Sequence, residues 1–221
     1  MTLVGYWPLN EDSGDKAYDH SGNENHGTIN NSGDSTVPGA KGPLDQDSYS
    51  FNGSNDYVDL GGSDFFDLNA PFTLSGWIWI DSSHPNLSDE EWNLLGKYDG
   101  SDGWIFRHWR DGLHLYYSGT EYTTKNYNPN RETWHHWTIK HDGSNLDFFI
   151  NGELFDSLSI SNSTTSSTQT LKIGQRGDDR LFTTGKISEV RIYNRPLTKS
   201  EVQYLHSVGQ RGLQTTSKKA S

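Results

Sequence analysis

The side chains best suited to bind a ligand lie between Trp104 and Tyr117, in the segment WIFRHWRDGLHLYY. Aromatic rings can lie against the apolar faces of sugars, while a few well-placed polar groups orient the ligand. A guanidinium and an imidazole in the same segment can hydrogen-bond to sugar hydroxyls. We therefore predict a glycan-binding face formed by Arg107, Trp109, His114 and Tyr116, with Asp179 of the charged loop at 176–180 on its rim.

A second interpretation of the same rings is structural. The long polar loop at 81–93, or a partner in an oligomer, could bury them and leave no ligand surface. A single surface tryptophan usually has such a structural explanation. Four polar and aromatic residues on one face make the two interpretations comparable.

A β-hairpin is needed to bring these residues together. Asp111-Gly112 predicts a two-residue turn, because a type I′ turn needs positive φ at both central positions. A turn there would pair Trp109 with His114. Since side chains alternate along a strand, the ligand-binding candidates would share one face. The other face is predicted to join the core through Trp104, Phe106, His108, Leu113, Leu115 and Tyr117.

Composition limits the classes of function. The chain has 221 residues and a formal net charge of −11, which argues against a nucleic-acid partner because such proteins present a basic face. No run approaches the roughly 20 apolar residues of a membrane span, so we expect no membrane insertion. There are no cysteines, which excludes disulfides and thiolate metal sites. The first residues, MTLVGYWPLN, do not resemble a signal peptide.

Short strands dominate the predicted elements. Segments of alternating apolar and polar residues recur between turn signals along most of the chain, which indicates an all-β sandwich of two antiparallel sheets. The segment FTLSGWIWI at 72–80 is apolar on both faces, so it is predicted to be a central strand that is covered on both sides or exposes rings to a ligand. Residues 49–52 and 56–60 are predicted to form a hairpin across Gly53-Ser54-Asn55.

One short helix is predicted near the end of the chain. Thr198 and Glu201 form the capping box T-x-x-E, in which each residue satisfies a backbone N–H of the other. Leu197 and Val202 complete a hydrophobic staple around this helix start. The helix is predicted to span 199–206. Residues 207–221 are polar and are predicted to be a mobile tail or linker.

Three segments together resemble laminin G-like jelly-roll domains of the concanavalin A-like lectin and glucanase superfamily. They are YWPLNEDSGDKAYDHSGNENHGTI at 6–29, YSFNGSNDYVDLG at 49–61 and GKISEVRIYNRPLTKSEVQYL at 185–205. FTLSGWIWI, ETWHHWTIKHDGSNLDFFINGEL and LKIGQR stand between them in the order of such domains. Several motifs in the right order are more specific than any one. The resemblance implies a jelly roll over residues 1–206.

The resemblance also implies a structural calcium ion that joins the N-terminal loop to the last strand. The matching positions are Asp19, Asn23 and Glu189, whose oxygens are the ligand type that calcium prefers. Ser188 stands where many relatives have an acidic residue, which would weaken the site. The alternative is a metal-free loop held by its own hydrogen bonds.

Catalysis is not expected. Glycosidases of this superfamily carry two glutamates in an E-x-D-x-x-E pattern, because hydrolysis needs an acid and a nucleophile on either side of one bond. That pattern is absent here. We predict a non-catalytic module that binds a glycan or a glycosylated surface, at an extracellular or virion surface. The alternative is a structural module, such as a virion decoration or spike subunit, that uses the jelly roll for protein contacts or a homo-oligomer.

Overall fold

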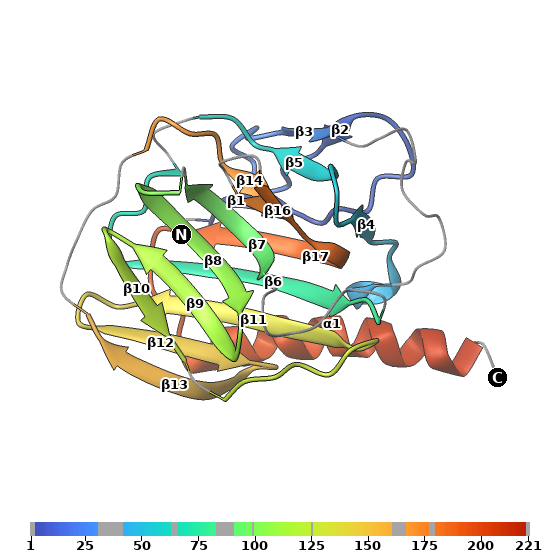
Figure 1. Ribbon diagram of the computed structural model, residues 1–221. Helices are drawn as coiled ribbons and strands as arrows, with labels where there is room; N and C mark the ends of the chain where they lie inside the picture. The colour runs from blue at the N-terminus through green and yellow to red at the C-terminus, as the bar shows by residue number, and fades with distance from the viewer. Residues whose placement is uncertain are drawn as a thin grey trace.

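Two antiparallel sheets pack face to face, with a long helix against the outside of one of them (Figure 1). The computed structural model describes residues 3–30, 42–62, 66–82, 91–98, 100–124, 126–160, 167–176 and 180–219. Sheet A has the strand order β1-β17-β6-β11-β12-β13, and β4 also pairs with β17. Sheet B has the order β10-β9-β8-β7-β14-β5-β3-β2. The predicted two-sheet sandwich is confirmed.

Some strands that follow one another along the chain lie in the same sheet, and others lie in opposite sheets. Sheet A contains β1 (Leu3–Trp7), β4 (Tyr49–Asn52), β6 (Phe72–Ile80), β11 (Trp134–His141), β12 (Asn145–Ile150), β13 (Glu153–Ser159) and β17 (Thr184–Tyr193). Sheet B contains β2 (Lys16–Ala17), β3 (Gly27–Asn30), β5 (Tyr57–Asp59), β7 (Glu91–Tyr98), β8 (Gly103–Trp109), β9 (Gly112–Tyr117), β10 (Thr120–Thr123) and β14 (Lys172–Ile173). A separate ribbon joins β15 (Gln175–Arg176) to β16 (Arg180–Phe182), and η1 (Pro43–Asp45) is a short 3₁₀ turn.

Large rings fill the space between the sheets. Trp7, Trp92, Trp104 and Trp137 have no exposed surface and belong to one continuous apolar cluster. Each aromatic side chain buries roughly 150–250 Å², so a few rings supply much of the core of a chain with only 31% hydrophobic residues. All six side chains predicted to face inward from the hairpin are fully buried.

The β8–β9 hairpin forms, but its predicted turn is wrong. Trp109 pairs with Gly112, and Arg107 pairs with His114, so the turn is centred on Arg110 and Asp111. A Cβ at Gly112 would lie 1.8 Å from the backbone oxygen of Thr124, so the glycine is required inside the strand for close backbone approach. Arg110 takes the positive φ of 56° instead. The register shifts by two residues, and this leaves every side chain on its predicted face.

A second predicted hairpin is also wrong. β4 pairs with β17 in sheet A, whereas β5 pairs with β3 and β14 in sheet B. The Asn52 side-chain oxygen accepts hydrogen bonds from the backbone N–H groups of Ser54 and Asn55, at 2.8 and 3.1 Å. This turn therefore carries the chain from one sheet to the other.

The central strand β6 is covered on both sides, as its pattern predicts. It lies between β17 and β11, with Leu74 and Ile78 in the core. On the outer face of sheet A, the Trp77 ring stacks with His206 of α1 (Lys199–Lys219) at a centroid distance of 5.5 Å. One apolar face of this strand thus packs into the core, and the other packs against the helix.

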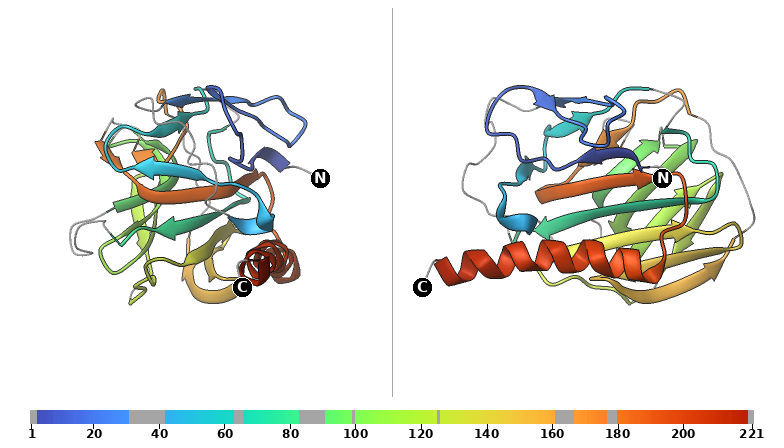
Figure 2. Two further views of the ribbon diagram at one scale, coloured as in Figure 1. Left: turned by 90° about the vertical axis from the view of Figure 1, so that its right-hand side faces the viewer. Right: turned by 180° about the vertical axis from the view of Figure 1, so that it is seen from behind.

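The helix begins as predicted but is longer. Thr198 Oγ1 accepts the Glu201 N–H at 3.2 Å, and the Thr198 N–H donates to Glu201 Oε2 at 2.8 Å, which forms the capping box. The predicted end at residue 206 is wrong, because α1 runs to Lys219 along the outside of sheet A (Figure 2). Gly209 continues the contact, since a Cβ there would lie 2.5 Å from the Trp77 ring. The assignment of residues 207–221 to a linker stays a prediction.

Candidate functional site

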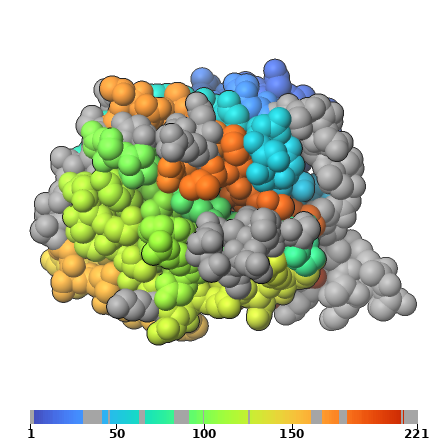
Figure 3. All heavy atoms as spheres, viewed as in Figure 1, coloured from blue at the N-terminus to red at the C-terminus, as the bar shows by residue number. Residues whose placement is uncertain are grey.

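The predicted binding residues lie on the outer face of sheet B, at the end of the sheet formed by β7 to β10. Figure 3 shows this side of the molecule. Arg107 and Trp109 come from β8, and His114 and Tyr116 come from β9. The structure therefore brings four of the five predicted residues together. Asp179 lies outside the described residues.

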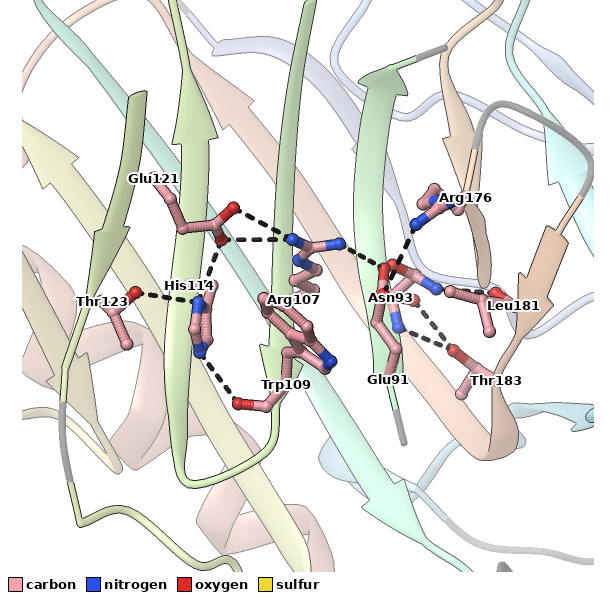
Figure 4. Close-up of polar contacts among 10 residues, drawn as sticks. All are labelled: Glu91, Asn93, Arg107, Trp109, His114, Glu121, Thr123, Arg176, Leu181 and Thr183. Carbon is pink, nitrogen blue, oxygen red and sulfur yellow. Dashed lines mark hydrogen bonds and ion pairs between the residues drawn. The ribbon is translucent and has the colours of Figure 1, made fainter. Parts of the chain in front are cut away.

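Arg107 is the centre of a polar network on this face (Figure 4). One guanidinium nitrogen donates to Glu91 Oε1 at 2.7 Å, and the other donates to both carboxylate oxygens of Glu121 at 3.0 and 3.2 Å. Arg176 lies 3.9 Å from the second oxygen of Glu91. Arg107 and Glu91 are each only 5% exposed, although their side chains lie on the outer face of sheet B. The Arg107–Glu91 pair is therefore shielded from water, and the network links β7, β8 and β10.

His114 joins the same network from β9. Its Nε2 lies 2.8 Å from the Trp109 carbonyl oxygen, and its Nδ1 lies 2.9 Å from Glu121 Oε1 and 2.9 Å from Thr123 Oγ1. A carbonyl and a carboxylate only accept hydrogen bonds, so a doubly protonated imidazole satisfies both contacts at once. The polar heads of Arg107 and His114 are therefore bonded within the protein, and the prediction that they reach sugar hydroxyls directly stays a prediction.

The two carboxylates of the network have opposite pKa shifts. Burial raises the pKa of Glu91 above its ordinary value, despite the neighbouring charges of Arg107 and Arg176. Burial also acts on Glu121, but the hydrogen bond from His114 and the charge of Arg107 outweigh it, so the pKa of Glu121 is lowered. Glu121 therefore carries the negative charge at the outer side of the network, and Glu91 depends on Arg107 to stay ionised.

Trp109 presents the main aromatic surface of this face. Its ring is half-buried and lies 4.4 Å from the Arg110 guanidinium and 4.9 Å from that of Arg107. Such cation–π contacts are worth about 0.5–1 kcal/mol at exposed sites. Tyr116 donates its hydroxyl to the Ser101 carbonyl oxygen at 2.7 Å, so its ring is also fixed. The two rings are held in place before any ligand arrives.

Three residues of this site were not predicted from the sequence. Glu91 directly follows Glu90, and Glu121 stands alone in sequence, so neither has the spacing that marks a functional carboxylate pair. Asn93 is fully buried, donates its side-chain N–H to the Leu181 carbonyl oxygen at 2.6 Å and donates its backbone N–H to Thr183 Oγ1 at 3.0 Å. Strand pairing is what places the two carboxylates at this site, because Glu91 lies opposite Trp109 and Glu121 lies opposite Tyr116.

The loop predicted to bind calcium is built around the Asp19 carboxylate. This carboxylate accepts hydrogen bonds from the backbone N–H groups of Tyr6, Ser21 and Asn25 at 2.8–3.0 Å, and from the Ser21 hydroxyl at 2.7 Å. Burial opposes ionisation, but these bonds together lower the pKa of Asp19. Asn23 points its amide nitrogen at the carbonyl oxygens of residues 3 and 4, at 2.9 and 3.0 Å.

The calcium site stays a prediction, and in this arrangement its candidate ligands already have partners within the protein. Glu189 accepts a hydrogen bond from the Tyr6 hydroxyl and is paired with Arg191, whose cation opposes a second positive charge. Tyr6 thus bonds Asp19 through its backbone N–H and Glu189 through its ring hydroxyl. Over the residues that the structure describes, no group of three His, Asp or Glu side chains could hold a metal. The arrangement fits the alternative of a loop held by its own hydrogen bonds.

Comparison with known protein families agrees with this fold. Residues 52–203 match a laminin G-type family model described as the concanavalin A-like lectin/glucanases superfamily. The protein belongs to this superfamily. The resemblance stated from sequence motifs is confirmed, and with it the jelly-roll architecture. No curated protein matches the sequence significantly.

Solved structures with the same architecture include receptor-binding domains of botulinum neurotoxins. The C/D mosaic domain superposes with a TM-score of 0.71 at 15% identity, over 93% of this chain and 51% of that one. A structure of botulinum neurotoxin type C, a toxin whose cell entry depends on interaction with two ganglioside molecules, has a TM-score of 0.66 at 13% identity with the same coverage. The DC binding domain solved with rat synaptotagmin II has a TM-score of 0.68 at 13% identity. These identities show the fold alone, and the chain spans about half the length of these structures.

Proposed function

We propose that this protein is a non-catalytic module that binds a glycan or a glycosylated surface through the outer face of sheet B. The observation that supports this proposal is the half-buried Trp109 ring, which lies beside two guanidinium groups, one of them held by a buried ion pair with Glu91. A ring held in one orientation loses little entropy when a sugar lies against it. Receptor binding by the fold's toxin neighbours, one of which interacts with gangliosides, is consistent with such a role. We place its action at an extracellular or virion surface.

The network is better suited to positioning than to proton transfer. Glu91 and Glu121 flank Arg107, and a pair of carboxylates is what glycoside hydrolysis requires. However, both are bonded to the same guanidinium, and Glu91 is 5% exposed, so a glycosidic bond cannot lie between them without breaking the network. We propose that both carboxylates hold Arg107 and, through it, Trp109.

Among the described residues, no helix is both long and apolar enough to cross a bilayer.

A glycan array with three forms of the protein tests this proposal. Trp109→Ala should weaken binding to at least one glycan that the wild type retains, because it removes the aromatic surface of the platform. Tyr204→Ala is the matched control, since Tyr204 is 65% exposed and lies on α1, the helix that packs against the outside of sheet A. This control should bind as wild type does. Equal binding by all three forms would refute a platform at Trp109.

The structural alternative rests on β13, an edge strand of sheet A. Leu154 and Phe155 on this strand are 49% and 42% exposed, and an exposed edge can pair with a strand of another chain. Light scattering during size-exclusion chromatography measures this directly. A stable oligomer that Leu154→Lys dissociates, together with no glycan binding by the wild type, would favour an assembly module over a lectin.

A further inference from the structure

A hollow lies on the outer face of sheet B, on the half formed by β3 and β5. It has a volume of about 390 Å³ and is lined by His26, Thr28, Asn30, Tyr57, Asp59, Leu60 and Gly61. Sites for small molecules usually measure about 300–1,000 Å³. Thr28 pairs with Asp59 and Asn30 with Tyr57 across the two strands, so the sheet fixes four of these side chains on one face. We call this site the β3–β5 hollow.

Asp59 supplies a carboxylate that is already oriented. One of its oxygens accepts the Gly61 N–H at 2.8 Å, and the other accepts the Thr170 hydroxyl at 3.1 Å. Each carboxylate oxygen can accept about two hydrogen bonds, so acceptor capacity is left for a ligand. Lys172 lies opposite Asp59 on β14, and its ammonium group lies 4.9 Å over the Tyr57 ring. The local charge is balanced, which favours a neutral ligand over an acidic one.

His26 supplies a donor whose tautomer is set by the neighbouring loop. Its Nδ1 accepts the Asp19 N–H at 3.0 Å, so a neutral ring carries its proton on Nε2. The edge-on contact with Tyr18, at 5.5 Å between centroids, further fixes the ring. The hydrogen bonds to the Asp19 carboxylate fold this loop, and the folded loop positions His26 at the hollow.

We propose that the β3–β5 hollow is a second saccharide site that takes one neutral hexose unit. A hexose offers adjacent hydroxyls, each of which both donates and accepts, together with apolar C–H groups. The Asp59 carboxylate, the Asn30 amide, the Thr28 hydroxyl and the His26 N–H provide matching acceptors and donors, and the Tyr57 ring provides an apolar surface. Tyr57 and Trp109 lie three strands apart in sheet B, about 14 Å at the usual strand spacing. The hollow is therefore separate from the Trp109 platform.

Ligand-observed saturation-transfer NMR with the methyl glycosides of glucose, galactose and mannose tests this site on the full chain. Wild type should show transfer from at least one of these probes. Asp59→Asn keeps the shape of the side chain and removes its charge, so it should weaken binding about tenfold, as charge-assisted hydrogen bonds are the strong ones. Tyr57→Ala should also weaken it, and the melting temperature of each variant reports whether it has folded.

Two controls separate this site from the Trp109 platform. Tyr204→Ala should bind the probe as wild type does, because this residue lines neither site. In a Trp109→Ala background, which removes the platform, Asp59→Asn should still weaken probe binding. Probe binding that is lost in Trp109→Ala but kept in Asp59→Asn would overturn the second site while supporting the first. The absence of transfer from all three probes to the wild type would overturn the second site alone, since the platform is tested by the glycan array.

Discussion

Removal of the Arg107 side chain should destabilise the protein strongly through Glu91. In Arg107→Met the buried Glu91 carboxylate loses its 2.7 Å partner, and among the described residues Arg176, at 3.9 Å, is the cation that remains near it. Breaking a buried ion pair from one side costs about 3–5 kcal/mol, and the residual cation places the expected loss near 3 kcal/mol. At about 2–4 °C per kcal/mol for a chain of this size, the melting temperature should fall by roughly 6–12 °C.

Urea denaturation with a double-mutant cycle measures this loss. Arg107→Met with Glu91→Gln should recover most of the stability, because no uncompensated charge is then buried. The effect of Arg107→Met alone should also depend on pH. Burial already raises the pKa of Glu91, and loss of the guanidinium raises it further. A carboxyl with a raised folded pKa contributes its stability below the unfolded value of 4.5 and loses it as the pH rises. The deficit should therefore grow from acidic to neutral pH.

Arg110→Met is the matched control for this experiment. Arg110 is exposed at the tip of the same hairpin, and its guanidinium also lies over the Trp109 ring. Its removal should cost no more than about 1 kcal/mol, the usual limit for exposed cation–π contacts. Equal losses in Arg107→Met and Arg110→Met would refute the conclusion that a shielded ion pair holds this face together.

Two further predictions concern acid and calcium. Among the described residues, burial lowers the pKa values of five histidines, to about 4 for His108. These rings therefore gain protons on unfolding between about pH 6.5 and pH 4, and the free energy of unfolding should fall as the pH drops through that window. His206→Gln should reduce this slope, measured by thermal unfolding across the pH range, and an unchanged slope would exclude its ring from the effect. Calcium at Asp19, expected from the family resemblance, stays a prediction. The saturated Asp19 carboxylate and the Glu189–Arg191 pair lead us to expect an unchanged melting temperature on chelation, whereas a fall would show that the loop takes up an ion.

The sequence was sufficient for the fold and for the faces of the hairpin. Side-chain alternation has a period of two, so an error of two residues in the turn left Arg107, Trp109, His114 and Tyr116 on the correct face. The start of α1 was also predictable, because a capping box is a local motif whose two hydrogen bonds involve neighbouring residues. Features decided by local chemistry or by periodicity were therefore accessible.

Features decided by contacts between distant segments were not. Gly112 resembles a turn residue, but the close backbone of Thr124 requires the glycine inside β9. The length of α1 depends on the Trp77 ring, against which His206 stacks and Gly209 packs. Glu91 and Glu121 become partners only when strand pairing brings both to Arg107. None of these contacts has a signature within a single segment.

The charged network on sheet B is better explained by positioning than by stability. A buried ion pair is seldom more stabilising than apolar residues of similar volume, so stability alone would not favour it on this face. The outer face of sheet A shows the contrast, because α1 covers it with apolar contacts from Val202 to the buried Phe149. If the network serves Trp109, then Arg107→Met with Glu91→Gln should retain near wild-type stability and still lose glycan binding. Stability and binding would then separate in one variant, which a purely structural network could not produce.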